Sequence, residues 1–561
     1  MSALPNTELG CVLPYGIPHA ISSSLRRWKY INWWADKDER IVSKLTSDYP
    51  RFVIHILVRK LRASIVDRYC VPDEDCLPFP TMETATTCIN FLRSNTATTC
   101  LDRLRLVHIA PLRSKAEKLS FDASAIRWTT FWVVVFHKED MKVAQQVWQH
   151  RGEGMSSRQA EFCLALLEPG YLAAVEGAKV KSEASAEVLG NGGVSSILDP
   201  VILPDGKDVM ATMQRRIAAL ASVDRRQTPV LPDDVFLYPS GMSAIAHGVD
   251  ALCDIHGRDK KFIIFGTTYS DTRPVIEKFG PGSVYLGGAS DAELDELELR
   301  LKLGERFTAL VCETPGNPML TSPDLVRIKK MSEDYGFLMV IDETVGTWVN
   351  VDALKFADMT FTSLSKSFSG ACNVLGGCIV INNLSPAYET LRKHFTTNYI
   401  NEYFPLDAIV MESNSRDFVS RVRRMNSNAA TLAAFLVKHI AVKEVRYPAL
   451  VDQEKYGQIR RPTGGNSMLL SIIFHKLPDA VLFYDHLECS KGATLGTNFT
   501  LANAFVLMAM KPKLAEVKKF GIVEESVRVS VGLEDPAQII AVFQKALNIV
   551  VESWAQMGMV S

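Results

Sequence analysis

The chain has 561 residues, of which 47% are hydrophobic and 22% charged, and its formal net charge is −1. This length exceeds one compact core and predicts two or three domains. The balanced charge argues against a broad basic surface for nucleic acid or an acidic membrane. The first ten residues lack the segments of a signal peptide, and no apolar run reaches the roughly 18 residues of a membrane span. We therefore expect a soluble, cytoplasmic protein with no nucleic-acid or membrane partner.

Four regions follow one another along the sequence. Residues 1–185 mix helical and extended signals, include the strand-like run FWVVVF and end in a helical run with a serine cap in SSRQAE. Residues 186–204 form a Gly- and Ser-rich linker. Residues 205–395 alternate short apolar runs with amphipathic helices, which predicts an α/β domain with a mostly parallel sheet covered on both faces. Residues 396–561 begin with a long helix at about 417–439 and predict a smaller α+β domain.

The eleven cysteines are scattered and contain no CxxC pair. The closest pairs, Cys70 with Cys76 and Cys372 with Cys378, have five residues between their members. That spacing fits no common zinc site, so the sequence predicts buried, reduced thiols and no metal.

Polar side chains follow the apolar runs of the predicted parallel sheet. In open α/β sheets, ligands bind outside the carboxyl ends of the strands, so these side chains are expected to meet. FLMVID ends in an acid, DMTFTS leads to a lysine in SLSK, TALVCE to an amide in TPGNP, and KFIIFG to a phenol in TTYSDT. FLYPSGM provides a turn and a helix start. The residues are Asp342, Thr344, Lys366, Asn317, Tyr269, Ser240, Gly241 and Met242.

Each residue type suits one task on a pyridinium phosphate. A carboxylate such as Asp342 keeps a pyridine nitrogen protonated, and Lys366 forms an imine once its pKa falls through burial. Backbone N–H groups at the helix start hold a phosphate, with added donors from Ser363 and Ser365. Arg528, on the late strand SVRVSVG, can bind a substrate carboxylate.

Each of these motifs alone has a commoner structural explanation: a helix cap, a solvated loop, a surface ion pair or a turn. Their joint occurrence in the order SGM, Y, TPGNP, DET, SLSK and VRVSVG leaves little room for chance. The combination indicates an enzyme that uses pyridoxal 5′-phosphate (PLP) on an amino acid.

The segments YPSGMSAI, ETPGNP, VIDETVGTWVNVD and SLSKSFSGACNVLGG resemble the PLP-dependent cysteine and methionine metabolism (trans-sulfuration) family, of fold type I. The resemblance is closest to fungal cystathionine γ-synthase-like proteins, which share the long N-terminal region with VWQHRGEGMSSRQAEFCL. It implies that Lys366 is the Schiff-base lysine and proton carrier, and that Tyr269 stacks on the ring and assists proton transfer. It also implies that Asn317 donates to the phenolic oxygen of the cofactor, and that the protein is a homo-oligomer, a dimer or tetramer.

Two positions depart from the family pattern. The stretch LDPVILPDGKD lacks the aromatic residue and the arginine that reach the phosphate of a neighbouring subunit. The family's Ser-Leu-Gly beside the carboxylate site is Thr494-Leu495-Gly496 here, so Thr494 adds a methyl group to the substrate pocket. Both departures suit a member whose substrate has changed.

The leading hypothesis is a transferase that carries out γ-replacement on an activated L-homoserine, O-acetyl-L-homoserine, with cysteine as the nucleophile. The same chemistry with a carbon or amine nucleophile, in specialised metabolism, stays open, because the motifs describe the cofactor and not the acceptor. A β- or γ-lyase is a further alternative. A non-catalytic binding relative is the alternative from another class.

Overall fold

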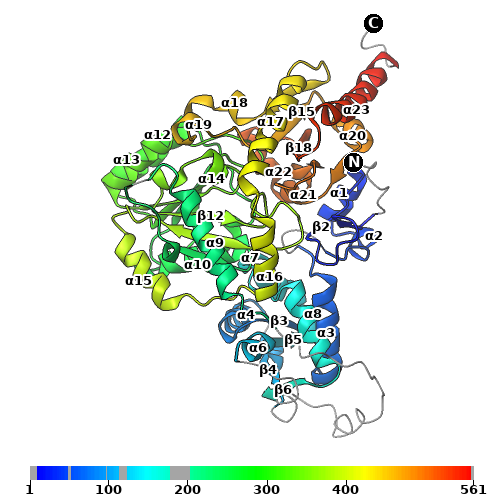
Figure 1. The fold of residues 1–561 in the computed structure, drawn as a ribbon, viewed down its shortest axis with the longest axis vertical. Helices are drawn as coiled ribbons and strands as arrows, with labels where there is room; N and C mark the ends of the chain where they lie inside the picture. Colours follow the sequence, from blue (N-terminus) through cyan, green and yellow to red (C-terminus); the bar gives the residue numbers. More distant parts are fainter. Residues whose placement is uncertain are drawn as a thin grey trace.

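The computed structural model describes residues 9–47, 52–96, 98–112, 123–176, 203–225 and 227–556. Residues 186–202 of the predicted linker lie outside these ranges. Figure 1 shows three bodies: an N-terminal sheet with its helices at one end, a central α/β body, and a C-terminal body beside the first helices of the chain.

The central body contains a seven-stranded sheet in the order β7-β13-β12-β11-β10-β8-β9. The strands from β12 to β9 run parallel, and β13 runs antiparallel to both β12 and β7. The predicted mostly parallel sheet is thereby confirmed. The strands are β7 (Val235–Tyr238), β8 (Phe262–Phe265), β9 (Ser283–Leu286), β10 (Ala309–Glu313), β11 (Leu338–Asp342), β12 (Met359–Ser363) and β13 (Gly377–Ile381).

Helices cover both faces of this sheet because its strands are apolar on both sides. In β8, Phe262 and Ile264 join one core with α10 (Gly241–His256) and α11 (Thr272–Phe279). Ile263 and Phe265 join a second core with α12 (Asp291–Lys302) and α13 (Leu325–Tyr335). This alternation explains the continuous apolar runs in the sequence. α9 (Lys207–Ala221) packs against β7 at the edge of the sheet.

The C-terminal body has a five-stranded sheet in the order β14-β15-β18-β17-β16. Its strands are β14 (Val442–Arg446), β15 (Leu469–Phe474), β16 (Ser490–Lys491), β17 (Leu501–Asn503) and β18 (Ser526–Ser530). The predicted long helix is α17 (Phe418–Leu436), which packs against α23 (Pro536–Gln556). The expectation that α17 opens this region is wrong, since Pro405 starts a separate helix before it, α16 (Pro405–Asn414).

The N-terminal sheet is antiparallel in the order β3-β5-β4-β6. The run FWVVVF is its central strand β5 (Phe131–His137). The predicted serine cap is Ser156, whose hydroxyl accepts from the backbone N–H of Gln159 at 3.2 Å and starts α8 (Ser157–Leu167). The prediction that the region ends in this helix is wrong, because β6 (Leu172–Glu176) follows and pairs with β4. The other elements are α3 (Ile56–Tyr69), β3 (Glu74–Phe79), α4 (Met82–Asn95), β4 (Arg105–Pro111) and α7 (Met141–Arg151).

The first described residues lie against the C-terminal body and not on the N-terminal sheet. α1 (Trp28–Ala35) packs on α20 (Leu477–His486) and α21 (Phe505–Met510). The backbone N–H of Leu25 donates to the Lys491 carbonyl at 2.8 Å. Residues 9–47 therefore reinforce the stretch that leads from Lys491 to Leu495.

Ten of the eleven cysteines have described side chains, and these are free thiols of which eight are buried. Among the described residues, no three His, Cys, Asp or Glu side chains gather in a group that suits a metal ion. No helix within those ranges combines the length and apolar composition needed to cross a membrane.

Candidate active site

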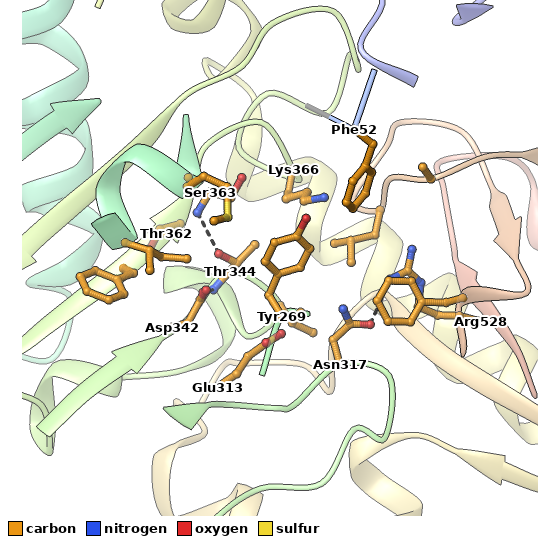
Figure 2. A pocket seen from close by; sticks show the side chains of 18 of the residues that line it. Phe52, Tyr269, Glu313, Asn317, Asp342, Thr344, Thr362, Ser363, Lys366 and Arg528 are labelled. Atoms are coloured by element: carbon orange, nitrogen blue, oxygen red, sulfur yellow. Dashed lines mark hydrogen bonds between the residues drawn. The ribbon is translucent and has the colours of Figure 1, made fainter. Parts of the chain in front are cut away.

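A cavity with about 670 Å³ of space lies at the carboxyl ends of β10, β11 and β12 (Figure 2). Nine of the twelve residues predicted from the sequence line it; the side chains of Ser240, Ser365 and Thr494 do not. The nine are Gly241, Met242, Tyr269, Asn317, Asp342, Thr344, Ser363, Lys366 and Arg528.

Lys366 comes three residues after β12 and is buried. Its Nζ donates a hydrogen bond to the Thr494 hydroxyl at 3.3 Å. Burial, and next the charge of Arg528, hold the pKa of Lys366 well below its usual range. A lysine in this state supplies a neutral amine, the form that attacks a carbonyl or accepts a proton.

Asp342 ends β11 and opens to the cavity. Its Oδ1 accepts from the backbone N–H of Thr344 at 2.9 Å, and the Thr344 hydroxyl accepts from the backbone N–H of Ser363 at 2.8 Å. These bonds fix both side chains relative to β12. Burial raises the pKa of Asp342, so its carboxylate gains from a cationic N–H partner such as a protonated pyridine nitrogen.

Glu313 is a second acid in the cavity that the sequence analysis missed. It is the in-register neighbour of Asp342 on the adjacent parallel strand and is 5% exposed. Burial, and next the charge of Asp342, raise the pKa of Glu313 well above its usual range, so its carboxyl is neutral. Its Oε2 has no hydrogen-bond partner among the described residues. The signal was present, since Glu313 is the last residue of the run TALVCE.

The helix start at Gly241 and Met242 faces the cavity. A Cβ added at Gly241 would lie 2.8 Å from the Ser363 Cβ, so only glycine allows this approach. The Ser240 hydroxyl is engaged elsewhere: it accepts from the Ser243 N–H at 3.0 Å and donates to the Gly152 carbonyl at 2.9 Å. The groups at this start that are left to bind a phosphate are therefore the backbone N–H groups at the N-terminus of α10.

The two serines that flank Lys366 differ. Ser363 lines the cavity, as predicted. The Ser365 hydroxyl donates to the Gly376 carbonyl at 3.2 Å and accepts from the Gly376 N–H at 2.9 Å. The structure thus does not bring Ser365 to the cavity; its hydroxyl ties the lysine loop to the segment before β13.

Arg528 lies on β18 and is buried at the cavity wall. Its Nη1 donates to the Asn317 Oδ1 at 3.0 Å, and its Nη2 donates to the Thr494 carbonyl at 2.9 Å. The guanidinium lies 4.1 Å from the Phe505 ring centroid. These contacts fix the guanidinium for recognition of a carboxylate.

Tyr269 follows β8 and is half-buried in the cavity. Figure 2 shows its ring in the middle of the site, with the hydroxyl on the side of Lys366. This placement agrees with a ring that stacks on a planar cofactor, the role predicted for it. Phe52, from the N-terminal region, also lines the cavity and had no signal in the sequence.

The cavity therefore combines a lysine of lowered pKa, a buried acid, a helix start and a guanidinium. Comparison with known families decides the assignment: the model of the Cys/Met metabolism PLP-dependent enzymes matches residues 209–548. The chain belongs to this family. Its cofactor is PLP, and three features fit that group: the Asp342 carboxyl with its raised pKa, the Lys366 amine with its lowered pKa, and the helix start at Gly241. A second model, the N-terminal domain of fungal trans-sulfuration enzymes, matches residues 57–156.

Two curated relatives match almost the whole chain. A cystathionine gamma-synthase of Neurospora crassa is 34% identical over 98% of this chain and 99% of its own length. A cystathionine gamma-synthase-like protein, ankD, of Aspergillus thermomutatus is 36% identical over 96% of this chain and 94% of its own. The crystal structure of cystathionine gamma synthase from Xanthomonas oryzae has a TM-score of 0.53 at 20% identity, and covers 62% of this chain and 87% of that chain. This last likeness confirms the fold type I architecture. The chain is thus a PLP-dependent, cystathionine γ-synthase-like enzyme.

Proposed function

We propose that this enzyme catalyses γ-replacement on an activated L-homoserine, with O-acetyl-L-homoserine as donor and the thiol of L-cysteine as acceptor. The observation that carries the proposal is the placement of Lys366 between two anchors in one cavity: Asp342 for the cofactor and Arg528 for a carboxylate. The end-to-end similarity to a cystathionine gamma-synthase supports the choice of donor.

Bound PLP supplies an electron sink that acidifies first Cα–H and then Cβ–H of the donor. Arg528 binds the donor carboxylate, and the Asp342 carboxylate keeps the pyridine nitrogen of the cofactor protonated. The neutral amine of Lys366 would accept the proton from Cα, pass it to the cofactor and, neutral again, accept the proton from Cβ while the Cγ–O bond breaks and acetate leaves. The thiol of cysteine would lose its proton to solvent and form the Cγ–S bond, and Lys366 would return one proton to Cβ and carry the other back to Cα. Donor and cysteine thereby give cystathionine and acetate.

A second candidate retains the donor chemistry but uses a carbon or amine nucleophile. The cations that line the described cavity are Lys366 and Arg528. In this proposal Lys366 binds the cofactor and Arg528 binds the donor carboxylate. No third cation among the described residues lines the cavity, which favours an acceptor without a second carboxylate. A homo-oligomer and a cytoplasmic location stay predictions for either candidate.

The test is mass spectrometry of the PLP-loaded enzyme given O-acetyl-L-homoserine, with and without L-cysteine. Cystathionine as the dominant product supports the first candidate. Acetate release without cystathionine supports the second candidate, and 2-oxobutyrate formed without an acceptor identifies a lyase. Failure to bind PLP would identify a non-catalytic relative and refute both proposals.

A further inference from the structure

Phe52 brings the N-terminal region into the catalytic cavity of its own chain. It is half-buried and lines the same cavity as Lys366 and Arg528. Figure 2 places its ring on the side of these two residues and away from Asp342 and Glu313. Phe52 therefore lies at the substrate side of the cavity and not at the side that holds the pyridine nitrogen.

A contact of the Phe52 ring and the packing of the two residues that follow it hold Phe52 in this position. Its ring meets Trp34 edge-on, with 5.1 Å between ring centroids and 80° between the ring planes. The next residue, Val53, packs against the core that residues 9–47 share with the C-terminal body. Ile54 is buried in the core of the N-terminal sheet. Phe52 is thus held between two separate cores, an arrangement that positions an aromatic ring at little entropic cost on binding.

Apolar residues other than Phe52 also line the cavity near Lys366 and Arg528. Ala493 and Leu495 flank Thr494, which bonds both Lys366 and Arg528, and the Phe505 ring lies 4.1 Å from the Arg528 guanidinium. Arg528 binds the carboxylate of the donor, and Lys366 lies at the donor's Cα, so the donor side chain must extend along the apolar residues. These residues therefore lie next to Cγ and next to the nucleophile that attacks it.

We propose that Phe52 forms the acceptor subsite, where it packs against the apolar part of the substrate beyond Cγ and shields that carbon from water. The inference rests on the proposed γ-replacement. Phe52 thereby determines the partition between replacement and elimination. In elimination, the donor takes up water and gives 2-oxobutyrate, ammonia and acetate. A closed apolar wall retains the acceptor and suppresses this route.

The first test measures products of Phe52→Ala with O-acetyl-L-homoserine and either L-cysteine or 1-propanethiol. We expect kcat/KM for the acceptor to fall about 10-fold and more for the apolar thiol, because an apolar contact is lost. Acetate release at saturating donor should fall less than formation of the replacement product, so the ratio of 2-oxobutyrate to replacement product rises. Phe52→Leu, which keeps an apolar side chain, should restore most of the replacement.

The matched control is Phe91→Ala. Phe91 is also half-buried in the N-terminal region and also packs against one aromatic ring, that of Phe279 at 5.1 Å, but it does not line the cavity. Phe91→Ala should leave the ratio of 2-oxobutyrate to replacement product at the wild-type value. Equal product ratios in Phe52→Ala and Phe91→Ala would overturn the role of Phe52.

A binding measurement separates this inference from the proposed function. The dissociation constants of L-norleucine and L-alanine, followed by cofactor absorbance, compare a side chain that extends beyond Cγ with one that does not. Phe52→Ala should raise the dissociation constant of L-norleucine about 10-fold relative to that of L-alanine. An unchanged ratio places Phe52 outside the subsite and refutes the inference. If the wild type releases no acetate, the proposed γ-replacement fails, while this ratio still decides whether Phe52 contacts the substrate side chain.

Discussion

The central sheet and the N-terminal region reach the same cavity in different ways. The sheet delivers its residues from strand ends: Asp342 and Glu313 close β11 and β10, and Lys366 follows β12. The N-terminal region delivers Phe52 from a short connection, and it supports the helix start of α10 through the Gly152 carbonyl. The first arrangement follows from local sequence and topology. The second depends on packing between separate segments of the chain, so it is tested by variants that change packing contacts and leave the charges as they are.

The largest expected effect comes from the central sheet. Lys366→Ala removes both the covalent attachment of the cofactor and the base, so acetate release should fall by about 10³-fold or more. The lysine-dependent absorbance of bound PLP should disappear as well. Both quantities are measured on the purified, PLP-loaded protein.

Lys491→Met is the control for this variant. Lys491 is also buried, and burial lowers its pKa to about 8, but it does not line the cavity. Turnover per folded molecule should stay near wild type, with folding checked by circular dichroism. If Lys366→Ala retained turnover, the assignment of the central sheet as the source of catalysis would be wrong.

Gly152→Ala tests whether the N-terminal region acts on the cofactor site. Gly152 ends α7 with φ +65°, and an added Cβ would lie 2.3 Å from the Ser240 hydroxyl. The methyl group must displace the cap of α10, where we expect the phosphate to bind. The dissociation constant of PLP should rise between about 10- and 100-fold, since an overpacked contact costs about 1–3 kcal/mol.

Gly336→Ala controls for backbone strain in that experiment. Gly336 ends α13 with φ +75°, but an added Cβ there meets nothing within 4 Å. Both variants carry the cost of a positive φ, whereas only Gly152→Ala creates a clash. Similar PLP affinities in the two variants would mean that the contact with Ser240 does not support the cofactor site.

The same contrast explains how far the sequence could predict the molecule. The apolar runs predicted β8, β10, β11, β12 and β13, because strands buried on both faces leave a local signal. Two hydroxyls predicted at the site bond elsewhere: those of Ser240 and Ser365 lie near the site in sequence, but each is held by backbone groups outside the cavity lining. Rotamers and local partners decide that outcome, and a sequence does not show them.

The N-terminal contribution could not be predicted for a different reason. Phe52 reaches the cavity because Val53 and Ile54 enter two different cores, a relation between remote segments. Glu313, in contrast, was readable, because it occupies the same strand-end position as Asp342. The register of two parallel strands is what makes these acids neighbours.

The smallest expected effect concerns a buried contact between the two regions. Glu402 precedes α16, is 6% exposed and accepts a hydrogen bond from the Thr81 hydroxyl of the N-terminal region at 2.6 Å. Burial, and next the charge of Glu153, raise the pKa of Glu402 to about 7 from its ordinary value of 4.5. The folded state therefore binds this proton more tightly than the unfolded state. The resulting stability is complete below pH 4.5 and is lost as the pH rises from 4.5 through 7.

Glu402→Gln keeps an acceptor for Thr81 but stays neutral at every pH. The variant should be more stable than wild type at high pH. Its gain in free energy of unfolding over wild type should be about 1–2 kcal/mol larger at pH 8.5 than at pH 5. Denaturant midpoints at the two pH values measure this difference. Glu389→Gln, at an exposed position of α15 (Tyr388–Asn398), should show no such growth with pH. If Glu402→Gln and Glu389→Gln behaved alike, the contact between Glu402 and Thr81 would be solvated, and burial of Glu402 would not contribute to the pH dependence of stability.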